Sequence, residues 1–413
     1  MQAHWEIAKA DDGWRLLRNG EPFYIQGAVA GGHLDALAAA GATALRVPPR
    51  QETLDRAAEL GLVALVNLPV RGERDGVNWD DEARVAAQRR EVLDVVASLK
   101  RHPAVMMWAV GNELDWIPPG RPHSPRLWQR LNDLAREIHR ADPHHPVCTV
   151  VGTGTFEQKV QQMARECPDF DLLGINAYGD IAQVAESARQ HWPKPYVIAE
   201  WGPTGHWQVP RTTWRAPLEQ TSSEKAHTIY ERYTNVILAD RAHCLGAFVF
   251  YWAEKQETTH TWYGLLRDGM KTESIDVMAR FWTGAWPENR APAVLGLTIA
   301  GVADPTNARL APGSAHQAQV ICFDPDHDPL TIAWDIRPEV QIPAGSYAGS
   351  LEKRAQPIAG LIEEPQGTAV RFTSPHTEGA YRLFVQVTDG NGHAGYANVP
   401  FHVAPQPDRA AAP

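Results

Sequence analysis

The sequence predicts an α/β protein in which a (β/α)8 barrel is followed by a small C-terminal β-sandwich. Two observations predict the barrel: eight short apolar runs alternate with eight segments of helical periodicity, and the connections between them alternate in length. A third observation predicts the sandwich. After a proline-rich joint at 282–294, the chain changes to short alternating segments separated by turn residues.

Each barrel element can be placed on the sequence. The expected strands are 23–30, 42–48, 62–69, 104–112, 146–152, 171–178, 196–202 and 245–252. The expected helices are 34–40, 51–60, 82–101, 125–141, 156–166, 181–191, 222–242 and 274–281. Helix-to-strand connections such as "LGL" (60–62) are short, whereas strand-to-helix connections such as 203–221 and 253–273 are long. The rim at the carboxyl ends of the strands is therefore the expected place of function.

A doubly wound open sheet is the alternative fold, because it also alternates strands and helices. Such sheets usually have about six strands and a glycine-rich phosphate turn after the first. The segment "VGTGT" (151–155) has only two glycines and follows the fifth expected strand. It predicts a tight turn and no nucleotide site.

Composition excludes several classes of partner. The 413 residues carry a formal net charge of -10, which argues against nucleic acid and acidic membranes. No run reaches the roughly 18 apolar residues of a membrane span, and the polar start "MQAHWEIAKADDGW" has no signal-peptide core. We expect a periplasmic or secreted protein of bacterial type whose signal is not in this sequence. The sequence makes no prediction of oligomeric state.

Tryptophan is unusually frequent, with 15 residues. Several occupy the long loops or the strand ends of the expected functional rim: Trp79, Trp116, Trp201, Trp207, Trp214, Trp252 and Trp262. We expect about half to pack the loops and the others to line a cleft, because flat aromatic faces suit the apolar faces of sugar rings. His206, beside Trp207, is a further candidate for substrate contact.

Two carboxylates stand at the expected strand ends on that rim. Glu113 follows the fourth strand in "MWAVGNEL", and Glu200 closes "VIAE" in the seventh. A pair of carboxylates across one cleft is the minimum equipment for cleaving a glycosidic bond, one as acid and the other as nucleophile or base. An isolated carboxylate at the end of an apolar strand costs stability unless something requires it there.

At these residues the sequence resembles a known family. "RHPAVMMWAVGNE" (101–113) resembles the acid/base signature of glycoside hydrolase family 2 TIM barrels, and "PYVIAEWG" (195–202) resembles the nucleophile strand of the wider clan of retaining barrel glycosidases. The resemblance covers roughly residues 14–285. It implies a retaining glycoside hydrolase acting on a β-linked oligo- or polysaccharide, with Glu113 as acid/base and Glu200 as nucleophile.

The resemblance also implies roles at matching positions. Asn112 would hold the sugar's 2-hydroxyl, Tyr178 would hydrogen-bond the nucleophile, and Arg46 would keep it ionised. Trp252 would form the floor of the sugar site. No cofactor and no metal is expected.

The sequence departs from the family in two ways. Typical members carry a jelly-roll and an immunoglobulin-like domain before the barrel, whereas about 22 residues precede it here. The segment "YWAEKQETTHTWYGLLRDG" (251–269) matches no general family role, and its Glu254 and Glu257 leave a different carboxylate pairing open.

Three functions remain open at this point. We expect the retaining hydrolase. A transglycosylase of glucanosyltransferase type would use the same glutamates, and a non-catalytic carbohydrate-binding protein would have kept the barrel without turnover. An adhesion role of the C-terminal sandwich is a further possibility.

The expected domain limits follow from these elements. A hairpin at 1–22 closes the barrel floor, the barrel spans 23–289, a sandwich spans 290–405, and 406–413 is a disordered tail. The sandwich resembles the immunoglobulin-like or polycystic-kidney-disease-type modules that accompany carbohydrate enzymes. Its acidic turn "DPDHDPL" (324–330) could bind calcium, but it lacks the glycine of a calcium loop, so an ordinary turn is expected. "ADPHHP" (141–146) is likewise expected to be a turn.

Overall fold

The computed structural model describes residues 3–116, 123–340 and 352–405. The chain divides into two compact units. Unit 1 comprises Met1–Gly202 and Glu231–Trp252, and unit 2 comprises Pro203–Tyr230 and Ala253–Pro413. The expected tail at 406–413 lies outside the described residues.

Unit 1 contains a closed barrel of eight parallel strands, in the order β10-β11-β4-β5-β6-β7-β8-β9. The strands are β4 (Ile25–Ala30), β5 (Ala44–Val47), β6 (Val63–Leu68), β7 (Val105–Asn112), β8 (Val147–Val151), β9 (Leu172–Asn176), β10 (Tyr196–Trp201) and β11 (Cys244–Trp252). Every one lies within a range expected from the sequence or starts one residue before it. The barrel is therefore confirmed, and the open sheet is excluded.

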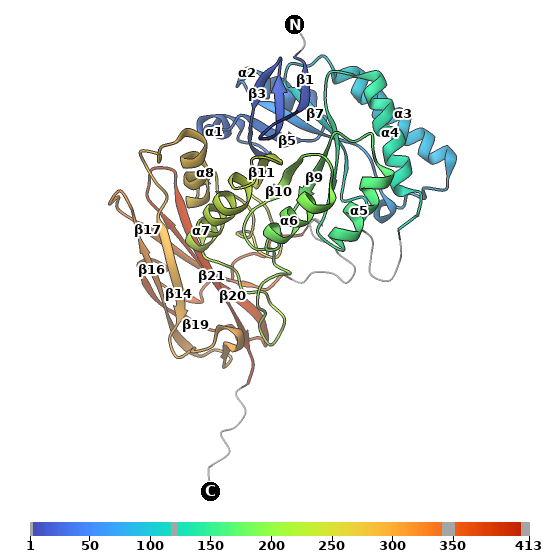
Figure 1. Ribbon diagram of the computed structural model, residues 1–413. Coiled ribbons are helices and arrows are strands. Elements are labelled where there is room, and N and C mark those ends of the chain that lie inside the picture. The colour runs from blue at the N-terminus through green and yellow to red at the C-terminus, as the bar shows by residue number, and fades with distance from the viewer. Residues whose placement is uncertain (1–2, 117–122, 341–351, 406–413) are drawn as a thin grey trace. The chain divides into compact units, whose positions relative to one another are not determined.

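Helices follow the strands in strict alternation and lie outside the barrel, as α3, α4, α5 and α6 show in Figure 1. The helices of this unit are α1 (Leu34–Ala39), α2 (Gln51–Glu59), α3 (Glu82–Leu99), α4 (Leu127–Ala141), α5 (Phe156–Glu166) and α6 (Ile181–His191). A 3-10 turn, η1 (Glu73–Asp75), precedes α3. After β10 comes α7 (Ser222–Arg232), which continues as the π-helical η2 (Tyr233–Leu238). The sequence predicted one continuous helix there, so the change of helix type was missed.

A small antiparallel sheet covers the amino ends of the barrel strands. It consists of β1 (Trp5–Ala10), β2 (Gly13–Arg18) and β3 (Glu21–Phe23), one strand more than the expected hairpin. Trp5 and Leu16 belong to the same buried cluster as barrel residues such as Met107. The amide of Trp14 donates to the carbonyl of Ala242 at 2.7 Å, just before β11. A Cβ on Gly13 would lie 2.4 Å from that oxygen, so glycine is required at this approach.

Unit 2 contains two four-stranded sheets that share one hydrophobic core. The first has the order β14 (Ala293–Ile299), β16 (Ala315–Phe323), β19 (Ala369–Thr373), β18 (Ile362–Glu363), and the second has the order β15 (Arg309–Leu310), β21 (Ala394–Val403), β20 (Gly379–Thr388), β17 (Thr331–Pro338). All pairs are antiparallel except β15 with β21. In β16 the inward Ala318 and Val320 alternate with exposed neighbours, the pattern of a strand with one buried face. The two sheets form the expected C-terminal sandwich; its likeness to an immunoglobulin domain stays a prediction.

Unit 2 also includes the segments that follow β10 and β11. It contains the small hairpin β12 (Leu266–Arg267) and β13 (Met270–Lys271), the helix α8 (Glu273–Thr283) and the 3-10 turn η3 (Pro305–Asn307). A buried ion pair joins Lys225 Nζ to Glu219 Oε1 at 2.5 Å, and Glu219 Oε2 accepts a bond from Asn398 of β21 at 2.6 Å. The segment that follows β10 thus contacts the sandwich strand β21 through a buried ion pair and a hydrogen bond. Local sequence patterns do not reveal this contact. The expected limits of 1–22, 23–289 and 290–405 stay a prediction.

None of the helices in the described part of the chain combines the length and the hydropathy required of a membrane span.

Candidate active site

Glu113 and Glu200 come from the carboxyl ends of two barrel strands. Glu113 directly follows β7, and its φ of 48° places it in the left-handed region. Glu200 lies in β10, where a register shift relative to β9 falls between Ile198 and Glu200. Irregular backbone at both positions turns each side chain away from the regular pleat of its strand.

Gly152 makes room for Glu113. It follows β8 within the segment "VGTGT", which the sequence predicted to be a tight turn. A Cβ at this position would lie 3.3 Å from the carboxyl carbon of Glu113. The glycine thus allows the loop to pass against the carboxyl group.

Arg46 of β5 lies beneath both carboxylates and is 2% exposed. Its Nη1 lies 3.6 Å from Oε2 of Glu200 and donates to Oδ1 of Asn176 at 3.1 Å. Its Nη2 donates to Oδ1 of Asn112 at 2.6 Å. Arg46 donates two further hydrogen bonds, from Nη1 to the carbonyl of Ala199 at 2.9 Å and from Nε to Oδ1 of Asn67 at 3.1 Å. A planar guanidinium with five donors suits this arrangement, and a lysine could not reproduce it.

Arg46 keeps its charge despite its burial. Burial lowers the pKa of Arg46 below its ordinary value, and the negative charge of Glu200 is the largest influence in the opposite direction. An arginine remains protonated in proteins even so. A buried cation therefore faces Glu200 from the barrel interior.

Asn176, the last residue of β9, connects the two halves of the site. Its Nδ2 donates to Oε1 of Glu113 at 2.8 Å and to Oδ1 of Asn112 at 3.0 Å, while its Oδ1 accepts from Arg46. It is also the β-sheet partner of Glu200. The sequence analysis missed this residue, although an amide at the end of an apolar strand is the same signal that singled out Asn112.

The amide of Asn112 is fixed in one orientation. Its oxygen accepts from both Arg46 and Asn176, and its backbone carbonyl accepts from Nη2 of Arg74 at 2.8 Å. Among the described residues, no acceptor bonds its Nδ2. Asn112 therefore presents two N–H groups for a ligand beside Glu113. Arg74 is a second site residue that the sequence analysis did not find.

Tyr178 hydrogen-bonds Glu200. Its hydroxyl donates to Oε1 at 2.6 Å, and the residue is 6% exposed. Phe250 of β11 sets its ring edge-on to Tyr178, with ring centroids 6.3 Å apart, and is half-buried. An apolar aromatic side chain with accessible surface therefore lies next to the partner of Glu200.

Trp252 was expected to form the floor of the sugar site, and that role stays a prediction. Its side chain is 0% exposed, and its indole N–H lies 3.3 Å from the carbonyl of His33. Phe250, two residues earlier in β11, is half-buried and keeps accessible surface.

Most of the tryptophans on the expected rim are buried, whereas about half of them were expected to pack the loops. Trp79, Trp201, Trp252 and Trp262 are each at most 2% exposed, and Trp214 packs against the sandwich core. Trp116 is half-buried, and Trp207 is 46% exposed. These indoles bury large apolar areas and so stabilise the long loops. The sequence position of a tryptophan does not tell whether it packs a loop in this way or binds a ligand.

His206 and Trp207 lie in unit 2. The two rings are edge-on with centroids 4.9 Å apart, and His206 Nε2 lies 3.3 Å from Oε1 of Glu257. Their contact with a substrate stays a prediction. Glu257 is buried and also pairs with Lys255 at 3.2 Å, and Glu254 accepts from the amide of Gly269 at 2.9 Å. Both carboxylates of the alternative pairing thus have partners within their own unit.

Comparison with known proteins gives the family. Residues 59–273 match the family described as "Glycosyl hydrolases family 2, TIM barrel domain". A β-glucuronidase of Paenibacillus borealis is 26% identical over 270 residues, which are 55% of this chain and 43% of that protein.

Solved structures share the fold. β-Glucuronidase 2 of Bacteroides uniformis superimposes with a TM-score of 0.52 at 14% identity, covering 98% of this chain and 48% of that one. β-Glucuronidase 3 of the same organism gives 0.51 at 15% identity, covering 97% and 52%. The chain thus spans about half the length of these relatives. By its barrel sequence and its closed eight-stranded fold, the chain belongs to the glycosyl hydrolase family 2 TIM barrel proteins.

Proposed function

We propose that this protein is a retaining glycoside hydrolase that cleaves β-linked glycosides by double displacement, with Glu113 as acid/base and Glu200 as nucleophile. The observation that carries the proposal is the buried hub of Arg46 and Asn176. Arg46 faces Glu200 at 3.6 Å and bonds Asn176, and Asn176 bonds Glu113 at 2.8 Å. One buried, hydrogen-bonded network therefore positions both carboxyl groups.

The two carboxyl groups have different surroundings, which supports the assignment of roles. Glu200 faces a buried cation and accepts from the Tyr178 hydroxyl, and both contacts favour its ionised form. On Glu113 the neutral amide of Asn176 donates to Oε1 only. A proton on the other oxygen is compatible with that bond. The different contacts of the two carboxyl groups support Glu200 as the nucleophile and Glu113 as the acid/base.

The reaction then proceeds in two steps. Glu200 attacks the anomeric carbon while Glu113 gives its proton to the leaving oxygen, and a glycosyl ester on Glu200 results. Glu113, now a carboxylate, removes a proton from water, which attacks the same carbon and restores Glu200. The two N–H groups of Asn112 donate to the sugar hydroxyl adjacent to the reacting carbon.

The substrate class follows from the relatives. The named relatives are β-glucuronidases, so β-glucuronides are the first substrates to test, with β-linked oligo- and polysaccharides as the broader class. A periplasmic or secreted location stays part of the proposal, because such glycans are accessible there.

Two other functions use the same site. A transglycosylase would share the first step and pass the sugar to a hydroxyl group. Its support from a tryptophan-rich acceptor cleft is weaker now that most of these rings are buried. A non-catalytic sugar-binding protein would keep Asn112 and Arg46 but show no turnover.

The test combines product analysis with matched variants. Aryl β-glucuronide, β-glucoside and β-galactoside are incubated with the full chain, and the first product is followed by NMR. A β-anomer formed first supports retention; an α-anomer overturns the mechanism. New longer products would identify transfer, and binding without turnover would identify the sugar-binding protein.

Variants assign the residues. Glu200→Gln abolishes turnover, and Glu113→Gln lowers it by about 10²- to 10⁴-fold for poor leaving groups, the usual contribution of general acid catalysis. The control Glu254→Gln retains activity, because this carboxylate is exposed and, in the described part of the chain, accepts its hydrogen bond from the backbone amide of Gly269. Inactivation by Glu254→Gln with an active Glu200→Gln would instead support the other carboxylate pairing.

A further inference from the structure

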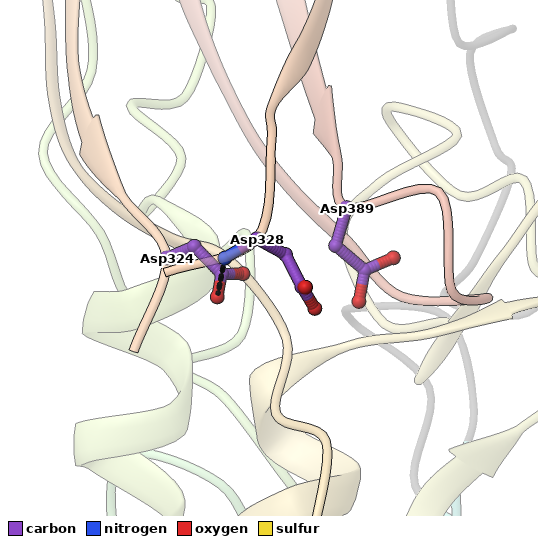
Figure 2. A group of neighbouring side chains, drawn as sticks. All are labelled: Asp324, Asp328 and Asp389. Carbon is purple, nitrogen blue, oxygen red and sulfur yellow. Dashed lines mark hydrogen bonds between the residues drawn. The ribbon is translucent and has the colours of Figure 1, made fainter. Parts of the chain in front are cut away.

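Three aspartates from distant parts of the chain meet at one end of the sandwich (Figure 2). Asp324 and Asp328 lie in the turn between β16 and β17, and Asp389 directly follows β20. One carboxylate oxygen of each lies within 4.8 Å of those of the other two. The turn was expected from the sequence, but Asp389, more than 60 residues away, was not part of that expectation.

Two of these carboxylates are removed from water. Asp324 is 5% exposed and Asp389 is 4% exposed. Oδ1 of Asp324 accepts from the amides of Asp326 and Asp328 at 2.8 and 3.0 Å. Its Oδ2 is buried and has no hydrogen-bond partner among the residues that the structure describes, and Figure 2 shows it on the side of Asp328 and Asp389. A buried carboxylate oxygen without a partner costs stability unless a ligand satisfies it.

The cluster lacks a matching positive charge. Among the described residues, no lysine or arginine forms an ion pair with any of the three. The basic side chain nearest to Asp389 is the imidazole of His393, with Nδ1 3.2 Å from Oδ2. Three carboxylates this close repel one another strongly unless a cation lies between them.

The other contacts of the cluster hold the carboxylates in place. Asp389 accepts from the amides of Asn391 and His393 through Oδ1, at 2.7 and 3.0 Å, and from Asn289 Nδ2 through Oδ2 at 2.7 Å. Asn391 Nδ2 donates to Oδ2 of Asp328 at 2.8 Å. Metal-bound carboxylates are commonly oriented by such outer hydrogen bonds.

The spacing of the three carboxylates fits a calcium ion. Calcium binds oxygen at about 2.3–2.6 Å, so ligand atoms on opposite sides of it are up to about 5 Å apart. Magnesium binds at about 2.0–2.1 Å, which limits the same separation to about 4.2 Å. Carboxylate oxygens within 4.8 Å of one another are therefore within reach of one Ca²⁺ ion. Flexible coordination also allows water and carbonyl oxygens to complete the shell.

We propose that Asp324, Asp328 and Asp389 form a calcium site that ties the β16–β17 turn to the β20–β21 turn. β16 belongs to one sheet of the sandwich, whereas β17, β20 and β21 belong to the other. The ion thus joins the two sheets at one end. This inference is independent of the proposed glycosidase activity.

The test measures calcium binding directly on the full chain. The protein is stripped with EGTA, dialysed, and titrated with CaCl₂ by isothermal titration calorimetry, with MgCl₂ in a parallel titration. One Ca²⁺ per chain is expected, with affinity at least 10-fold higher than for Mg²⁺. Equal binding of both ions would overturn the calcium assignment, and no binding at millimolar Ca²⁺ would overturn the site.

Matched variants locate the ion. Asp324→Asn and Asp389→Asn should weaken Ca²⁺ binding at least 10-fold, whereas Asp326→Asn should leave it unchanged. Asp326 lies in the same turn but is exposed and outside the cluster, with Oδ2 accepting from the amide of Arg290 at 2.7 Å. Circular dichroism without calcium checks folding. If a buried variant does not fold, Asp328→Asn, which is half-buried, takes its place. Unchanged binding in the cluster variants would overturn the proposal.

Discussion

The hydroxyl of Tyr178 donates a hydrogen bond of 2.6 Å to Oε1 of Glu200, while Arg46 faces the other oxygen at 3.6 Å. Each oxygen of Glu200 therefore has its own partner. One partner is neutral and can be removed without changing the charge of the site.

Tyr178→Phe removes only the hydroxyl group. A hydrogen bond to a charged group contributes about 1.5–3 kcal/mol, so we expect kcat/KM to fall about 10- to 100-fold at 1.4 kcal/mol per decade. The ring and its contact with Phe250 remain. The melting temperature should change little; a large loss of stability with normal kcat in the folded fraction would contradict a role in positioning Glu200.

Asn176→Ala tests the residue that the sequence analysis missed. The change removes bonds to Arg46, Asn112 and Glu113 at once, at about 1 kcal/mol each. We expect kcat/KM to fall about 100-fold or more. Asn67→Ala is the control because it removes a single bond to Arg46, and it should cost less than about tenfold. If kcat/KM fell equally in the two variants, Asn176 would matter no more to the site than Asn67, which would contradict its role in linking Arg46 to Glu113.

Arg46→Met removes the partner that Glu200 shares with three side-chain amides, those of Asn67, Asn112 and Asn176. Breaking a buried charge pair by removing one side costs about 3–5 kcal/mol, which urea denaturation should detect. Arg46→Lys should not restore activity, because an ammonium group cannot form the fork. The control Arg56→Met interrupts exposed pairs with Asp35 and Glu59, worth about 0–1 kcal/mol. Equal stability of Arg46→Met and the parent would contradict the structure.

Asp276 of α8 predicts a pH dependence of stability in unit 2. Burial raises the pKa of Asp276 to about 7 from an ordinary 3.8, partly offset by the bond from the amide of Ala291. Between pH 4 and 7 the folded state therefore holds a proton that the unfolded state has lost, so stability falls as pH rises through this window. The full effect is on the order of a few kcal/mol, at about 1.4 kcal/mol per pKa unit.

The measurement for Asp276 compares unfolding at pH 5 and pH 8. Asp276→Asn keeps the shape but cannot ionise, so it should be more stable than the parent at pH 8. The slope with pH should be smaller in the variant. An unchanged slope would assign the pH dependence to other groups.

Trp207→Ala tests the exposed tryptophan beside His206. If Trp207 contacts the substrate, KM rises several-fold while kcat is retained. This result is expected when a contact is lost that binds the substrate and the transition state equally well. Trp286→Ala is the control, since Trp286 is similarly exposed at 43% against 46% but stacks on Arg290. Identical kinetics of the Trp207 variant and the parent would remove it from the site.

The sequence predicted the elements of the barrel closely because they depend on local patterns. Apolar runs bounded by turn residues placed β7 and β10, and their ends placed Glu113 and Glu200 on one rim. The roles of the tryptophans were harder to predict, because an indole that packs a loop and one that binds a sugar look alike in sequence. Burial of Trp252 and Trp262 required the tertiary structure.

The sequence alone determined the order of strands and helices, the rim on which two glutamates stand, and the C-terminal sandwich. These follow from periodicity and turn chemistry, which act over a few residues. Only the tertiary structure decided that Asn176 joins Arg46 to Glu113 and that Asp389 joins Asp324 and Asp328. Those contacts connect residues more than 60 positions apart, and their partners are selected by how the strands close in space rather than by any local pattern.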